Sequence, residues 1–203
     1  MPKGLDTTRN LSATAVAIKA SGCAFVARYL SQSHWKLVEQ PEVDAIMAAG
    51  LNLVLVYEDA PTSTDYFSFG RGQADGARAA QQAHSVSAPA GTVLYFAVDY
   101  DASSDAITGV ITQYFNGVSN ALKSFSASDD VTYRVGVYGS GATCAAITGS
   151  GLASCGWLAQ AHGWAGFDSY TGWSIRQAMP ANIAGLSVDP DDATGNYGAM
   201  TSA

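Results

Sequence analysis

The stretch Leu94-Tyr95-Phe96-Ala97-Val98-Asp99-Tyr100-Asp101 decides the fold, because it reads as a buried strand that ends in two carboxylates. Successive side chains of a strand alternate between its faces, so Asp99 and Asp101 are expected on one side, with Cα atoms ~6.6 Å apart. Two carboxylates that close raise each other's proton affinity, which suits acid–base chemistry on a glycosidic bond. The alternative is a pair that faces water or caps the helix expected from Asp105.

Strand-like and helix-like segments alternate around this stretch. Strands are expected over residues 4–8, 23–30, 51–57, 92–98 and 133–138, and helices over residues 12–20, 41–49, 73–85, 105–123 and 142–147. Three further strands, over residues 156–161, 173–179 and 186–189, leave little room for helices between them. Alternating units imply a parallel sheet, and eight strands in one domain imply a closed barrel. The predicted fold class is α/β: a single TIM-type barrel over residues 1–203, irregular and of (β/α)5(β)3 type, with helices reduced after strand five.

The composition limits the possible partners. The chain of 203 residues is 48% hydrophobic and carries a formal net charge of −7, so it lacks the basic footprint that nucleic-acid binding needs. No apolar run reaches membrane-spanning length, and no Cys/His spacing resembles a zinc site. We therefore expect no nucleic acid, no membrane span, no metal and no cofactor, and a monomer. The opening Met-Pro-Lys-Gly is not a signal peptide.

The three cysteines leave two alternatives open. Cys23 opens an apolar strand and is expected to be a buried thiol. Cys144 and Cys155 are separated by a short Gly/Ser-rich connection, and they form either a small disulfide loop or two free buried thiols.

The ends of the predicted strands carry acids, aromatic rings and amides. In a TIM-type barrel, the carboxyl ends of the strands form one rim, where the chemistry takes place. Carboxylates and amides bind sugar hydroxyls, and aromatic rings stack on sugar faces, so the pattern predicts a saccharide site. For any single ring, a place in the core is the more common alternative. The candidate acids are Asp6, Glu58, Asp99, Asp101 and Asp189, and the candidate substrate-binding residues are Tyr57, Tyr138, Trp157, Gln160, Trp173 and Gln177.

A set of short motifs adds a family resemblance. In order, they are Gly4-Leu5-Asp6, Tyr57-Glu58, Phe96-Ala97-Val98-Asp99-Tyr100-Asp101, Gly136-Val137-Tyr138-Gly139-Ser140-Gly141, Trp157-Leu158-Ala159-Gln160-Ala161 and Val188-Asp189-Pro190-Asp191. The set covers nearly the whole chain and resembles the bacterial glycoside-hydrolase-like domain family, long catalogued as a domain of unknown function. That family is similar to the family twenty-five lysozymes. The resemblance implies a (β/α)5(β)3 barrel that cleaves peptidoglycan between N-acetylmuramic acid and N-acetylglucosamine.

The resemblance also implies roles for four acids. Asp101 would be the general acid and Asp99 would stabilise the cationic transition state, while Asp6 and Asp189 would orient that pair. The lysozymes have Glu at the acid position, so the side chain of Asp101 is one methylene shorter. Catalysis is sensitive to displacements of ~1 Å. Either the pocket is tighter, or Glu58 supplies the proton, or the domain binds sugar without cleaving it.

The leading prediction is therefore a glycoside hydrolase of lysozyme-like, muramidase type. Its substrate would be peptidoglycan or a related N-acetylated polysaccharide, and its location would be secreted or in the cell envelope. The first alternative is a non-catalytic carbohydrate-binding or cell-wall-binding domain on a degenerate hydrolase fold. A barrel with another acid-dependent activity, such as amide hydrolysis, is the third possibility.

Overall fold

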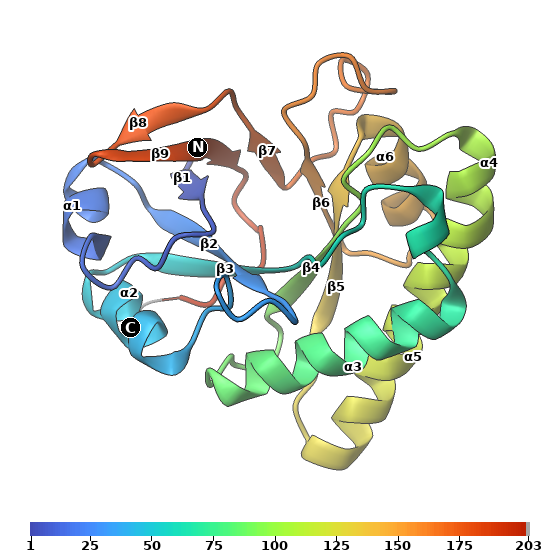
Figure 1. Cartoon of the computed structure of the whole chain (residues 1–203), viewed down its shortest axis with the longest axis horizontal. Coiled ribbons are helices and arrows are strands. Elements are labelled where there is room, and N and C mark those ends of the chain that lie inside the picture. The colour runs from blue at the N-terminus through green and yellow to red at the C-terminus, as the bar shows by residue number, and fades with distance from the viewer. Residues whose placement is uncertain (202–203) are drawn as a thin grey trace.

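A closed barrel of eight strands forms the centre of the computed structural model, which describes residues 1–201 (Figure 1). Seven strands are parallel and follow chain order, and β9 closes the ring by pairing antiparallel with both β7 and β1. The short strand β8 pairs with β9 alone and forms a hairpin beside the ring. The strands are β1 (Lys3–Asp6), β2 (Phe25–Leu30), β3 (Asn52–Tyr57), β4 (Val93–Ala97), β5 (Arg134–Gly139), β6 (Cys155–Leu158), β7 (Ile175–Gln177), β8 (Ala181–Ile183) and β9 (Leu186–Ala193).

The helices cover the outside of the first part of the barrel. They are α1 (Ala15–Ala20), α2 (Gln40–Ala48), α3 (Phe69–Ser85), α4 (Ser104–Ala106), α5 (Thr112–Asp129) and α6 (Gly141–Gly149), with a 3-10 turn η1 (Thr64–Tyr66) and a π turn η2 (Ile107–Ile111). Residues 159–201 contain no helix, so the predicted barrel with bare final strands is confirmed. Among the described residues, no helix is both long and apolar enough to cross a membrane. Strand β8 was not predicted, because its three residues are partly or fully exposed and carry no alternating pattern.

The side chains of the barrel strands pack into two separate cores, one inside the barrel and one between the strands and the helices. Tyr95 points inward and packs with Trp157 and Phe25 inside the barrel. Its neighbour Phe96 points outward into the layer between strands and helices, where it meets Phe115 and other apolar residues. This alternation assigns each strand residue either to the barrel interior, which leads to the mouth, or to the outer layer.

Glycines let α3 and α5 cross closely outside the sheet; the two helices lie side by side in Figure 1. A Cβ at Gly72 would collide with the carbonyl oxygen of Tyr114, and a Cβ at Gly117 with that of Phe69. The close approach lets the Tyr114 hydroxyl donate a 3.0 Å hydrogen bond to Asp75 on α3. The crossing thus fixes α3 against β2 and β3, and the candidate acid Glu58 directly follows β3.

The structure decides between the two cysteine alternatives in favour of free thiols, since Cys23, Cys144 and Cys155 are all unpaired and buried. Cys144 lies in the outer layer, where its Sγ is 3.4 Å from the carbonyl oxygen of Trp157. Cys155 belongs to the barrel interior, where its Sγ lies 3.6 Å from Nη2 of Arg134. The two sulfurs are therefore on opposite faces of the barrel wall.

Three thiols are expected to react with Ellman's reagent when the purified protein is unfolded without reductant. Because no cross-link restricts the unfolded chain, the melting temperature should be the same with and without reductant. A count of one thiol, together with a melting temperature that falls under reductant, would contradict this placement.

Candidate functional site

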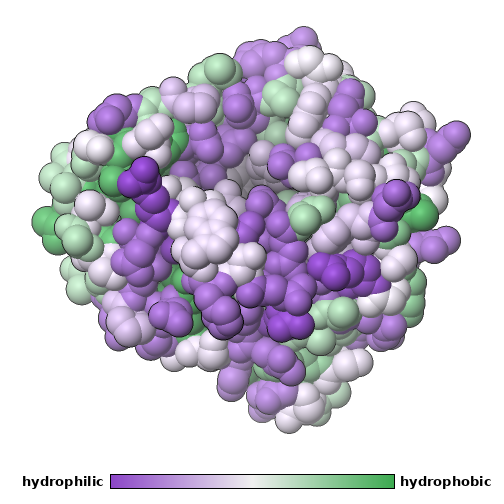
Figure 2. Space-filling view, in the orientation of Figure 1, coloured by the Kyte–Doolittle hydropathy of each residue, from purple (hydrophilic) through white to green (hydrophobic). Residues whose placement is uncertain are grey.

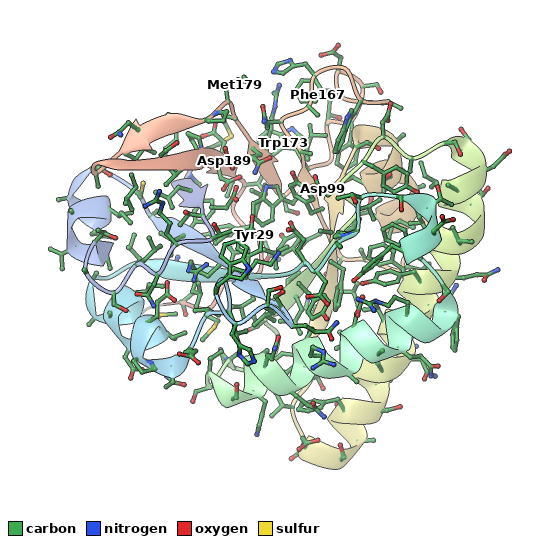
Figure 3. All side chains as sticks on the ribbon, viewed as in Figure 1. Tyr29, Asp99, Phe167, Trp173, Met179 and Asp189 are labelled. Atoms are coloured by element: carbon green, nitrogen blue, oxygen red, sulfur yellow. The ribbon has the colours of Figure 1, made fainter. Side chains whose placement is uncertain are left out.

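Four acids converge on the mouth of the barrel from different strands. Asp6 ends β1 and lies opposite Asp189 in the antiparallel register of β1 and β9. Glu58 directly follows β3, and its charge acts on both Asp6 and Asp99. Figure 3 shows Asp99, Asp189 and Tyr29 around the centre of the barrel. In the same orientation, Figure 2 shows a recess near the middle of this face, bordered by hydrophilic surface.

Asp6 is the most deeply buried of these four acids, with 1% of its surface exposed. Its Oδ1 accepts a 2.9 Å hydrogen bond from the Tyr29 hydroxyl, and its Oδ2 accepts a 2.6 Å bond from Nε2 of Gln177. Burial, with the charges of Asp189 and Glu58, outweighs these hydrogen bonds and raises the pKa of Asp6 to about 7. Asp6 is thus poised to change its charge near neutral pH.

Gln177 links the mouth residues of several strands. Its Oε1 accepts a 3.1 Å bond from the Tyr138 hydroxyl and a 3.3 Å bond from the backbone N–H of Gln160, while its Nε2 donates to Asp6. β5, the loop after β6, β7 and β1 are therefore joined by one amide group. This arrangement brings together the predicted residues Tyr138, Gln160 and Gln177.

A buried lysine contributes a positive charge to the site. Nζ of Lys36 lies 2.9 Å from Oε1 of Glu58 and 5.1 Å from the ring centre of Tyr29, and the lysine side chain is only 5% exposed. The backbone N–H of Asp99 donates a 2.9 Å bond to the carbonyl oxygen of Pro61, which fixes the start of the loop after β4. Burial and the charge of Glu58 raise the pKa of Asp99, and Lys36 opposes them.

Asp101 lies apart from this group. β4 ends at Ala97, so the strand alternation does not extend to Asp99 and Asp101, and the prediction that they share a strand face is wrong. Asp101 is exposed, and its Oδ1 accepts a 2.9 Å bond from the backbone N–H of Ala165. Its charge is not among those that shift the pKa of Asp99. The role of Asp101 as general acid stays a prediction.

Two of the predicted sugar contacts, Tyr57 and Trp157, have buried side chains. The Tyr57 side chain faces outward under α3, where its hydroxyl donates to Oδ2 of Asp59 at 2.7 Å, and the residue is 1% exposed. Trp157 is also 1% exposed and fills the barrel interior, with Nε1 donating a 3.0 Å bond to Oδ1 of Asp191. The role of each ring in substrate binding stays a prediction.

Trp173 lies just before β7 and not on it. It lines a hollow of ≈ 330 Å³ together with Phe167, Arg176 and Met179. Figure 3 shows Phe167 and Met179 at the upper edge of this face. The role of Trp173 in substrate binding stays a prediction.

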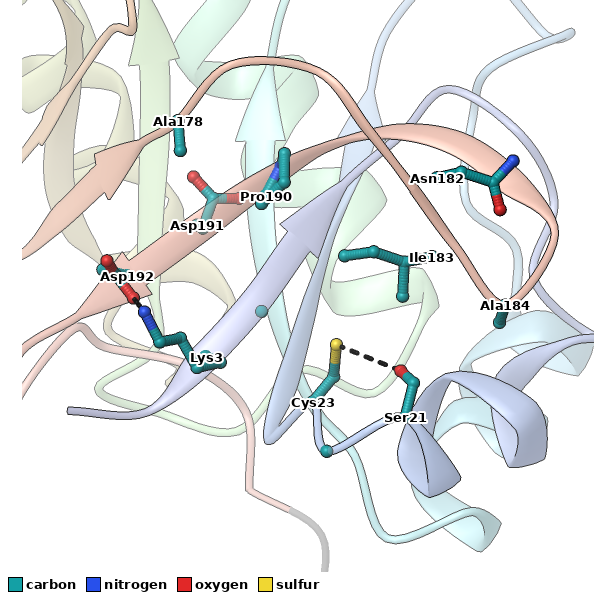
Figure 4. A pocket seen from close by; sticks show the side chains of 12 residues that line it. Lys3, Ser21, Cys23, Ala178, Asn182, Ile183, Ala184, Pro190, Asp191 and Asp192 are labelled. Carbon is teal, nitrogen blue, oxygen red and sulfur yellow. Dashed lines mark hydrogen bonds and ion pairs between the residues drawn. The ribbon is translucent and has the colours of Figure 1, made fainter.

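A second cavity, of ≈ 460 Å³, lies outside the barrel wall, between β1 and the β8–β9 hairpin (Figure 4). Two charged side chains that line it form an ion pair, in which Nζ of Lys3 is 2.5 Å from Oδ1 of Asp192. The Cys23 thiol at its edge lies 3.8 Å from the Ser21 hydroxyl. The acids that line this cavity are Asp191 and Asp192, and none of the four mouth acids is among its lining residues.

Sequence reasoning left four residues of the mouth region out of the candidate site: Tyr29, Trp35, Lys36 and Asp191. Tyr29 was detectable, because it stands near the end of a predicted strand. Trp35 and Lys36 lie in a loop with no motif. Asp191 was missed because the last strand was expected to end at Asp189, whereas β9 continues to Ala193.

The raised pKa of Asp6 predicts a pH dependence of stability. A carboxyl whose pKa rises from 3.8 to about 7 on folding adds stability below pH 3.8, and this stability is lost as the pH rises to about 7. Asp6→Asn should therefore flatten the fall in unfolding free energy between those limits, measured by urea unfolding at several pH values. The exposed Asp168→Asn should follow the wild type. If the unfolding free energy of Asp6→Asn fell with pH as steeply as that of the wild type, the raised pKa of Asp6 would be contradicted.

Comparison with known proteins agrees with this architecture. Residues 16–196 match the Rv2525c-like, glycoside hydrolase-like domain family. The uncharacterized protein FadG of Bacillus subtilis is 31% identical over 150 residues, which are 72% of this chain and 26% of FadG. The chain thus spans about a quarter of that relative.

Two solved structures show the fold. The Tat-secreted protein Rv2525c of Mycobacterium tuberculosis, in complex with L-tartrate, superposes with a TM-score of 0.80 at 21% identity over 98% of both chains. A family GH25 lysozyme from Aspergillus fumigatus superposes with a TM-score of 0.56 at 13% identity, over 97% of this chain and 95% of the lysozyme. The expected relationship to lysozyme barrels is confirmed at the level of the fold, and the chain belongs to the Rv2525c-like family of glycoside hydrolase-like domains.

Proposed function

We propose that the barrel mouth binds peptidoglycan or a related N-acetylated polysaccharide and hydrolyses its glycosidic bond. The observation that carries the proposal is the convergence of Asp6, Glu58, Asp99 and Asp189, with a raised pKa at Asp99 beside an ion-paired Glu58. Glycoside hydrolysis needs one carboxyl that holds a proton and one that is ionised. The family membership and the lysozyme-like fold support the same chemistry.

The geometry favours Asp99 as the proton donor. Burial raises the pKa of Asp99, whereas Glu58 is ion-paired with Lys36 and would stabilise the positive charge of the transition state. The family resemblance supports a second version, in which Asp101 donates the proton and Asp99 is the stabiliser. In a third version Glu58 donates the proton. Asp6 and Asp189 orient the acids in all three.

The test is incubation of the protein with purified peptidoglycan, followed by assay of new reducing ends and by co-sedimentation. Reducing ends above those of an Asp99→Asn preparation support hydrolysis. Co-sedimentation without reducing ends supports binding alone. Absence of both would reject the proposal.

Binding without cleavage is the second candidate function, and the placement of Asp101 favours it. Oδ1 of this shorter acid is held by the backbone of Ala165 in the loop after β6, away from the charges around Asp99. If Asp101 is the donor that the chemistry needs, this contact must break before a proton is delivered. A domain in which it does not break would hold the glycan and leave it intact.

The proposed substrate also suggests where the protein acts. Peptidoglycan lies outside the cytoplasmic membrane, so the function requires export to the envelope or beyond. A similar fold in a Tat-secreted protein supports this location.

Trp35 is expected to contribute to glycan binding. Its side chain is 73% exposed, on a loop held to the mouth by the Lys36–Glu58 pair and by the backbone bond from Val38 to Tyr29. Trp35→Ala should weaken binding of chitin-derived or peptidoglycan-derived oligosaccharides roughly tenfold, the equivalent of ~60 Å² of ring surface at ~25 cal/mol per Å². Calorimetric titration measures this loss. Trp35→Phe should retain most of the affinity, and wild-type affinity in Trp35→Ala would remove the ring from the glycan path.

A further inference from the structure

Asp191 lies inside the barrel, one layer below the mouth acids. On β9 it stands two residues after Asp189, and the strand alternation places both on the inner face. Its register partners are Gly4 on β1 and Gln177 on β7. Gly4 carries no side chain, so the next inward side chain of β1 is that of Asp6.

The carboxyl of Asp191 is buried and only half satisfied. The residue is 2% exposed, and its Oδ1 accepts the 3.0 Å bond from the indole N–H of Trp157. Its Oδ2 has no hydrogen-bond partner, and no ion pair within residues 1–201 includes Asp191. An ionised carboxylate left in that state is costly, because the buried charge has neither an ion-pair partner nor a full set of hydrogen bonds.

The titratable groups that face Asp191 are acids and a phenol. Besides burial, the charges of Asp6 on β1, and of Asp189 and Asp192 on its own strand, raise the pKa of Asp191. Burial raises the pKa of Tyr138 on β5, and the charge of Asp191 in turn raises it further. Lys3 is engaged with Asp192, so it is not the partner of Asp191. Burial, followed by the charge of Asp6, raises the pKa of Asp191 well above the ordinary range.

We propose that Asp191 is a positioning residue that keeps a proton on Oδ2 while Asp6 is ionised, so that the two buried carboxyls together carry at most one negative charge. The proton turns the unpartnered oxygen into a donor and leaves Oδ1 to accept from Trp157. Asp6 then ionises without a second charge beneath it. A neutral Asp191 keeps the ionisation of Asp6 within the neutral range, and the use of this for catalysis rests on the proposed hydrolysis. The protonation of Asp191 does not depend on that proposal.

Infrared spectroscopy of the protein at pH 8 tests the proton directly. Asp6 is then mostly ionised, and the buried carboxylates of Glu42 and Asp75 are paired with arginines, so Asp191 should give a protonated-carboxyl C=O band. The band should disappear in Asp191→Asn and remain in the neighbouring control Asp192→Asn. In Asp191→Asn, the midpoint of Asp6, followed by carbon NMR of labelled aspartate, should move by less than about half a pH unit, because a neutral group replaces a neutral group.

Two results would overturn the proposal: no protonated-carboxyl band in the wild type at pH 8, or a fall of one pH unit or more in the Asp6 midpoint of Asp191→Asn. If Asp191→Asn does not fold, Trp157→Phe provides a second measurement. Loss of the indole bond should shift the band while keeping it present, and an unshifted band would assign it to another acid. Because neither readout uses a glycan, an inactive protein would reject the proposed function and leave this inference standing.

Discussion

Replacing Asp99 with asparagine is expected to lower the release of reducing ends from peptidoglycan by roughly 10²–10⁴-fold, the usual contribution of a positioned acid or base. Asp99 is the central carboxyl in two of the three versions of the mechanism, and its pKa is raised by burial and by Glu58. Asparagine keeps the shape of the side chain and removes its proton chemistry. The melting temperature should stay close to that of the wild type, which separates a catalytic effect from unfolding.

Two further variants identify the proton donor. Asp101→Asn should cost as much as Asp99→Asn if Asp101 donates, and much less if its task is to hold Ala165. Glu58→Gln should abolish cleavage of substrates with poor leaving groups, yet spare activated aryl glycosides, if Glu58 is the donor. Equal loss on both substrates would argue against an acid role for Glu58. Wild-type turnover in Asp99→Asn would make that carboxyl structural.

Glu42→Gln is expected to destabilise the fold by about 3–5 kcal/mol, because it leaves a buried positive charge without its partner. Nε of Arg28 is 2.6 Å from Oε1 of Glu42, and both side chains are 1% exposed. The same carboxylate oxygen also accepts a 2.8 Å bond from the backbone N–H of Leu11. Urea unfolding measures the loss.

The exposed ion pair of Lys3 and Asp192 is the matched control. The Lys3 side chain is 67% exposed, so Lys3→Met should change stability by only about 0–1 kcal/mol. Similar losses for Glu42→Gln and Lys3→Met would show that burial does not decide the cost. Nη1 of Arg28 donates to the carbonyl oxygen of Thr7, the residue after Asp6, so the Glu42 variant should also loosen the mouth.

The barrel was predictable because its strands and helices alternate with clear stop signals, and strand ends located Asp6 and Glu58 at the mouth. Asp99 lies two residues beyond the end of β4, and Asp189 reaches the mouth from within the antiparallel strand β9. The face of Tyr57 was not predictable, since the run from Leu51 is apolar on both sides of the strand and gives no period.

Other parts of the site depend on backbone paths that side-chain type does not encode. The chain leaves the strand after Ala97, which separates Asp101 from the other acids. Lys36 enters the mouth from a loop, and its ion pair with Glu58 joins residues that no local pattern relates. Asp191 lies below the mouth because β9 runs antiparallel to β1. The beginning of β9 is therefore at the mouth, and its later residues lie deeper in the barrel.

The closure of β9 onto β1 has a consequence for how the protein folds. Asp6 and Asp189 come from nearly opposite parts of the sequence, and they meet only when the last barrel strand docks. Contacts between residues so far apart require the closure of a very long loop, and topologies dominated by such contacts fold slowly. The helical layer formed by α3 and α5 is local by comparison. We therefore expect the acid cluster to assemble late in folding, so that a partly folded chain with native helices would still lack it.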